Sequence, residues 1–127
     1  MTAKEFRVAL PNRPGELAKL AKMLGKKGVN ITTIVGLAAG NTSTLAFLTE
    51  DESRALSVLK EGKYKFKAVP VVMVRMSDKP GALARVAKKL GNKKINIEGV
   101  YLVTRSKKMA QVAICVKDPK KAGAALR

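Results

Sequence analysis

Hydrophobic positions along the first part of the chain follow two periods, one typical of strands and one typical of helices. Residues 5–10 (EFRVAL) have apolar side chains at every second position, which predicts a half-buried strand. After Pro14, apolar residues recur at i, i+3, i+4 and i+7 while lysines occupy the other face. This pattern predicts an amphipathic helix that begins near Pro14 and ends at Gly28. Its apolar stripe consists of Leu17, Leu20, Ala21 and Leu24.

The next segments complete a β-α-β-β-α-β series. Two stretches rich in β-branched and apolar residues predict strands joined by a hairpin turn at Gly40-Asn41. Asp51 predicts the N-cap of a second helix, which ends near Gly62. The three strands of this part of the series are expected at residues 29–37, 42–48 and 64–69.

The segment NRPGELAKLAKMLGKKGVNI (residues 12–31) occurs a second time as DKPGALARVAKKLGNKKINI (residues 78–97). A repeat of this length indicates one supersecondary unit that is used twice. The second series is expected to comprise a strand at 71–76, a helix at 81–90, a strand at 95–103, a hairpin tip at 104–108, a strand at 109–116 and a short helix that opens at Asp118-Pro119.

The expected fold is therefore α+β, with two tandem ferredoxin-like βαββαβ units at residues 1–69 and 70–127, antiparallel sheets and helices on one face. Pro70 marks the junction. The second unit lacks its last strand, so either another segment fills that place, the sheet edge is open, or the natural domain continues further. Lys94 stands where the first repeat has Gly28, and we expect either a different helix end there or backbone strain.

Composition excludes several classes of function. The 127 residues include no histidine, which removes the usual general base and metal ligand. The one cysteine, Cys115, lies in an alternating apolar run and is expected to be a buried structural thiol. We therefore predict no catalytic residues, no metal, no cofactor and no enzymatic activity. No apolar run has membrane-spanning length and no signal-peptide block is present, so we expect a cytoplasmic chain with no membrane partner.

Positive charge is concentrated in the second half of the chain. Residues 1–63 carry 10 Lys/Arg against 6 Asp/Glu (+4), and residues 64–127 carry 16 against 3 (+13), for a net charge of +17. Such an excess attracts polyanions in a salt-dependent way. Solvated helix faces explain much of it, and a surface for nucleic acid or an acidic partner is the alternative. Nucleic acid is the less favoured partner because the few aromatic residues form no stacking platform.

The loop between the first strand and the helix of each repeat has the features of an anion site. Backbone N–H groups converge at the helix start with the positive end of the helix dipole, an arrangement that suits a carboxylate. Asn12 or Asp78 stands beside this loop, and Asn30 or Asn96 begins the following strand. Because such side chains accept hydrogen bonds from an ammonium group, the loop is the complement of an α-amino acid.

Both repeated segments resemble the signature of the ACT domain, a ferredoxin-like regulatory module that binds amino acids, and specifically stand-alone proteins with two ACT units in tandem. The resemblance implies a small-molecule amino acid bound at an ACT–ACT interface, a homodimer, and a regulated biosynthetic enzyme as a further partner. The ligand-binding residues it implies are Asn12, Pro14, Gly15, Glu16, Leu17, Asn30 and Ile31 in the first repeat, and Asp78, Gly81, Ala82, Leu83, Asn96 and Ile97 in the second.

Two other interpretations of these residues stay open. Pro-Gly is also needed simply to form the turn, and Asn30 and Asn96 can cap or tie neighbouring loops through backbone hydrogen bonds. ACT units also serve as assembly modules that bind no ligand. The second repeat departs from the family pattern, because Asp78 replaces an amide with a charge and Lys94 replaces the loop glycine.

Overall fold

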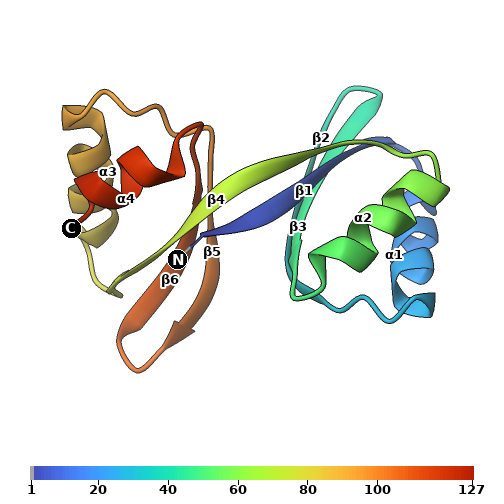
Figure 1. The fold of residues 1–127 in the computed structure, drawn as a ribbon, viewed down its shortest axis with the longest axis horizontal. Coiled ribbons are helices and arrows are strands. Elements are labelled where there is room, and N and C mark those ends of the chain that lie inside the picture. The colour runs from blue at the N-terminus through green and yellow to red at the C-terminus, as the bar shows by residue number, and fades with distance from the viewer. Residues whose placement is uncertain (1) are drawn as a thin grey trace. The chain divides into compact units, whose positions relative to one another are not determined.

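The structure is a computed structural model that describes residues 2–127. The chain divides into two compact units. The N-terminal unit comprises Lys4–Ala68, and the C-terminal unit comprises Val69–Arg127 together with the residues up to Ala3. Each unit contains strands with two helices packed against them (Figure 1).

The N-terminal unit has the strand order β2-β3-β1-β4. β3 pairs antiparallel with both β1 and β2. Its elements are β1 (Thr2–Pro11), α1 (Glu16–Lys26), β2 (Ile31–Ala39), β3 (Thr42–Thr49), α2 (Glu52–Glu61) and the first part of β4 (Lys65–Ser77). β2 therefore lies at the edge of the sheet.

In the C-terminal unit, β6 pairs antiparallel with both β4 and β5. The elements after β4 are α3 (Ala82–Asn92), β5 (Gly99–Ser106), β6 (Met109–Cys115) and α4 (Pro119–Ala125). The other neighbour of β4 is β1, whose first residues belong to this unit.

Two strand predictions need correction. The strands predicted at 64–69 and 71–76 are one strand, β4, which begins at Lys65 and continues through Pro70. Proline and the residue before it both tolerate extended backbone, so Pro70 need not interrupt the strand. β5 begins at Gly99, later than predicted, and continues to Ser106. The apolar residues that suggested the earlier start, Ile95 and Ile97, pack against the core outside the strand ladder.

The start of each repeated helix also differs from the prediction. Helix α1 begins at Glu16, and its N-cap is Gly15 in the left-handed region at φ 88°. Gly81 is the N-cap of α3 at φ 87°. Pro14 lies in the preceding turn and not in the helix. Because side chains are unfavourable in this conformation, glycine is required at both positions.

The helix ends bear out the expectation of strain at Lys94. Gly28 follows α1 at φ 75° and Lys94 follows α3 at φ 58°. The terminal hydrogen bonds match, since Val29 N donates to Leu24 O and Ile95 N to Leu90 O, both at 2.9 Å. The second repeat therefore keeps the same helix end with a lysine in a conformation that favours glycine.

Predictions based on capping residues and on burial are confirmed. Asp51 Oδ1 accepts a hydrogen bond from Arg54 N at 3.0 Å, and Asp118 Oδ1 accepts one from Lys121 N at 3.1 Å. Cys115 is completely buried. Within residues 2–127, no helix has the length and apolar content needed to cross a bilayer.

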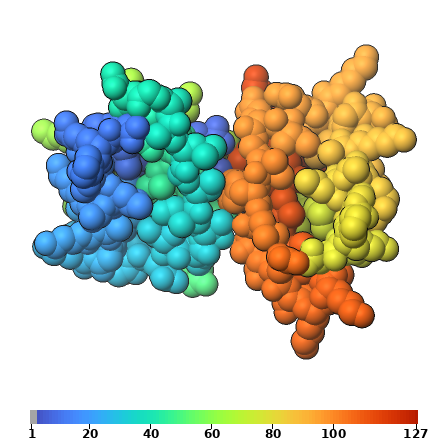
Figure 2. Space-filling view, turned by 180° about the vertical axis from the view of Figure 1, so that it is seen from behind, coloured from blue at the N-terminus to red at the C-terminus, as the bar shows by residue number. Residues whose placement is uncertain are grey.

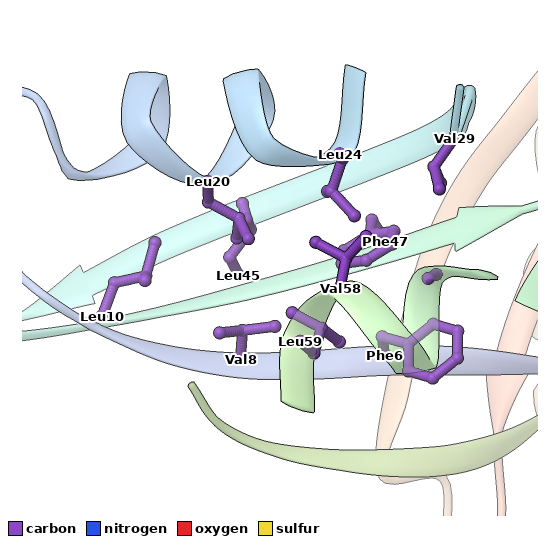
Figure 3. Packing of buried hydrophobic residues seen from close by; sticks show 11 residues of the cluster. Phe6, Val8, Leu10, Leu20, Leu24, Val29, Leu45, Phe47, Val58 and Leu59 are labelled. Atoms are coloured by element: carbon purple, nitrogen blue, oxygen red, sulfur yellow. The ribbon is translucent and has the colours of Figure 1, made fainter. Parts of the chain in front are cut away.

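Each unit has its own hydrophobic core between its helices and its sheet. In the N-terminal unit, Leu20 and Leu24 of α1 point toward Leu45 and Phe47 of β3 (Figure 3). Leu17, the first residue of the predicted apolar stripe, is instead half-exposed. The core of the C-terminal unit includes Val72, Leu90, Val112, Ile114, Val116 and Ala122.

Candidate functional site

A pocket of about 300 Å³ lies in the N-terminal unit where the chain passes from β1 into α1. Gly36 and Ala38 of the edge strand β2 form one side of it, and residues 11–13, Glu16 and Leu17 form the other. Leu10, Ser43 and Leu45 complete the lining.

The strand register fixes which face of the sheet carries the pocket. Gly36 lies opposite Leu45, and residues directly opposite each other in antiparallel strands project to the same face. Leu45 belongs to the core beneath α1 and α2. The pocket therefore continues the apolar core past the start of α1 to the sheet edge, where the absence of a side chain at Gly36 leaves room.

Asn12 connects the loop to the β2–β3 turn. Its backbone N–H donates to Asn41 O and its Nδ2 donates to Gly40 O, both at 2.9 Å. Asn12 therefore ties the loop before α1 to this turn. The side-chain oxygen of Asn12 is the part of its amide that can accept a hydrogen bond from a ligand.

Charges of both signs lie on the helix side of the pocket. Arg13 Nε donates to Glu16 Oε2 at 2.6 Å, and the Glu16 side chain is only 16% exposed. Among residues 2–127, no side chain caps the start of α1. The first-turn N–H groups and Arg13 together favour a carboxylate, and Glu16 favours an ammonium group.

The negative charge of Glu16 also acts on the side chain of Tyr64. Burial raises the pKa of its phenol, and the negative charge of Glu16 raises that pKa further. The Tyr64 hydroxyl lies 3.7 Å from Met23 Sδ of α1.

Asn30 does not join Asn12 within one unit. Asn12 precedes α1, whereas Asn30 follows that helix and immediately precedes β2. The two residues are thus at opposite ends of β2, a separation of about 30 Å for a strand of this length. Asn30 is exposed, and Ile31 packs against the core.

The corresponding residues of the second repeat have different surroundings. Asp78 forms an ion pair with Arg105 of β5, with Arg105 Nη2 at 2.7 Å from Asp78 Oδ2. Ala82, at the position of Glu16, is buried, and Leu83 is half-exposed like Leu17. Asn96 is exposed at the far end of β5, and Ile97 packs against the core.

Sequence reasoning did not identify Arg13, Gly36, Ala38 and Ser43 as pocket residues. Arg13 lies inside the repeated segment, three residues before Glu16, so the opposite charges of the two residues could have indicated their ion pair. The other three come from β2 and β3, and only the register of those strands places them beside the loop.

Comparisons with known proteins identify the fold. Neither the scan against protein-family models nor the search of curated proteins finds a match. A crystal structure of a protein from Bacteroides thetaiotaomicron matches with a TM-score of 0.89 and 25% identity, covering 99% of this chain and 87% of that one. The ligand-free regulatory subunit of aspartate kinase from Thermus thermophilus matches with a TM-score of 0.69 and 19% identity, covering 99% and 88%.

The regulatory subunit of aspartate kinase from Thermus flavus also matches, with a TM-score of 0.65 and 16% identity over 98% of this chain and 90% of that one. At these identities the likeness to the two aspartate kinase subunits is one of fold. It agrees with the fold that the resemblance of the repeated segments implied. The chain has the fold of the regulatory subunits of aspartate kinase.

Proposed function

We propose that the chain is a non-catalytic regulatory protein of two tandem ACT units, residues 1–69 and 70–127, that binds a free α-amino acid in the pocket of the N-terminal unit. One observation carries the proposal. The pocket combines a guanidinium, a carboxylate and an uncapped helix start with an apolar floor, within the described residues. These groups match the carboxylate, the ammonium group and the side chain of an amino acid.

The charges and size of the pocket favour a short, neutral amino acid. Arg13 and Glu16 neutralise each other, so the site offers no net charge to an acidic or basic side chain. The floor is formed by Leu10, Leu45 and Ala38, and Ser43 supplies one hydroxyl. Alanine, serine, threonine and valine are the ligands that fit this chemistry best.

The proposed dimer places this pocket at an interface. β2 is an edge strand with unused backbone hydrogen-bonding groups, and Leu37 on it is 76% exposed. Figure 2 shows residues of β2 (cyan) at the surface of the N-terminal unit. Antiparallel pairing of β2 with β2 of a second copy would bring Asn30 of that copy to the Asn12 end of the strand, and would complete the site.

Ligand binding at such an interface would regulate without chemistry. An amino acid that contacts both copies binds the paired state better than the separated state, so it shifts the population toward the pair. The fold likeness to regulatory subunits favours a biosynthetic enzyme as the regulated partner, which is an argument by analogy.

The test is a thermal-shift screen of the standard amino acids with size-exclusion chromatography of the same samples. We expect alanine, serine, threonine or valine to raise Tm, because a ligand that binds only the folded state stabilises it. Glu16→Gln should abolish the shift by removing the carboxylate that holds the ammonium group. Glu61→Gln, the same change at the exposed end of α2, is the matched control and should retain the shift.

Two outcomes would contradict the proposal. A screen in which no amino acid changes Tm, for a chain that elutes as a firm dimer, would favour the assembly module without a ligand. Equal loss of the shift in Glu16→Gln and Glu61→Gln would show that charge in general, and not the pocket, holds the amino acid.

A further inference from the structure

The strand registers show which residues of the second repeat correspond to the residues that line the pocket of the first. Gly36 lies opposite Leu45, which lies opposite Val8. In the C-terminal unit, Leu102 lies opposite Val112, which lies opposite Val74. Val8 and Val74 stand at the same place in the two repeats, so Leu102 takes the position of Gly36.

By strand register, Arg105 also takes the position of Ala38. Ala38 pairs with Ser43, and Arg105 pairs with Ala110, the residue that corresponds to Ser43 on the central strand. An irregularity between Leu102 and Thr104 adds one residue to β5, so a constant spacing of the two repeats misses this match. A methyl group in the first repeat is thus replaced by a long cationic side chain on the same face of the sheet.

Arg105 extends from this position to the loop of its own repeat. Its Nε and Nη2 each lie 2.7 Å from Asp78 Oδ2, and Asp78 is the counterpart of Asn12. Leu102 supplies a side chain where the first repeat has none at Gly36. The counterpart of Glu16 is Ala82, which has no charge to hold an ammonium group.

We propose that the amino acid binds only in the N-terminal unit, because Leu102 and the Arg105–Asp78 ion pair occupy the corresponding space in the C-terminal unit. This inference rests on the proposed function and specifies it further. Gly36 and Ala38 are then the residues that permit binding. The C-terminal unit has the same backbone at this place but does not bind the amino acid.

The experiment is isothermal titration calorimetry of the full chain with alanine, serine, threonine and valine, each titrated separately. We expect no more than one molecule bound per chain. Ala38→Arg places in the first repeat the side chain found in the second, and should weaken binding at least tenfold. Gly36→Leu should do the same, although a side chain there meets Leu45 Cδ1 at 3.2 Å and circular dichroism must show that the variant is folded.

The matched control is Asp78→Asn with Arg105→Ala, which removes the ion pair of the second repeat. An exposed ion pair contributes little stability, so this variant should fold. Because Leu102 and the uncharged Ala82 remain in the second repeat, its affinity and its number of bound molecules should equal those of the wild type. Two molecules per chain, or binding that is lost in this variant and kept in Ala38→Arg, would overturn the inference alone. No heat of binding from any of the four amino acids would overturn the proposed function and this inference with it.

Discussion

The two repeats share a helix and its turns but differ in what stands opposite the start of that helix. α1 and α3 have the same left-handed N-cap glycine and the same terminal hydrogen bonds. The edge strands differ, with Gly36 and Ala38 in β2 against Leu102 and Arg105 in β5. The two repeats therefore share their backbone, and the proposed difference in binding rests on a few side chains of one strand.

The largest predicted effect tests what the repeats share. Leu24 of α1 and Leu90 of α3 occupy the same place and are both completely buried. Leu24→Ala and Leu90→Ala should each lower the free energy of unfolding by about 2–5 kcal/mol, because each leaves a cavity in a packed core. Urea denaturation measures both. A large loss in one variant with no loss in the other would show that the two cores are not equivalent.

A smaller effect tests the helix ends. Lys94→Gly should stabilise the protein by about 1 kcal/mol, because glycine adopts the left-handed conformation at φ 58° without the penalty of a side chain. Gly28→Lys, the reciprocal change, should destabilise it by about the same amount. Both are measured by thermal and urea denaturation. Stabilisation by the second change would mean that the left-handed backbone is not retained in solution.

The smallest predicted effect concerns the hairpin tips. Gly40 has a positive φ in the first hairpin, whereas both Lys107 and Lys108 have one in the second. The tip of the second hairpin (deep orange) projects from its unit (Figure 2). Lys108→Gly should stabilise the chain by about 0.5 kcal/mol, since a turn of this type favours glycine. Gly123→Ala in α4 is a reference, because the added Cβ meets nothing within 4 Å. It measures how much stability a glycine costs relative to alanine when no contact changes.

Features that depend on a few neighbouring residues could be predicted from the sequence. Asp51 and Asp118 cap their helices because a short polar side chain bonds to an N–H three residues later. The strain at Lys94 follows from comparing it with Gly28. The continuity of β4 could not be predicted, because Pro70 is compatible with either a break or an extended strand.

The candidate site depended on information that is not local. Of the residues that the repeated motif singled out, Asn12, Glu16 and Leu17 line the pocket, whereas Asn30 is at the other end of β2. The match between Ala38 and Arg105 requires the strand register, because one added residue in β5 shifts it. The sequence showed that the repeats were related, and the pairing of strands was needed to show how their sites differ.

The central claim is that one repeat holds the ligand and the other does not. Its most direct test is a titration of the ¹⁵N-labelled chain with threonine, followed by NMR. We predict that the backbone amides of Gly15 and Gly36 shift as threonine is added, while those of Gly81 and Leu102 stay unchanged. Shifts of equal size in both repeats, or shifts confined to Gly81 and Leu102, would contradict the account.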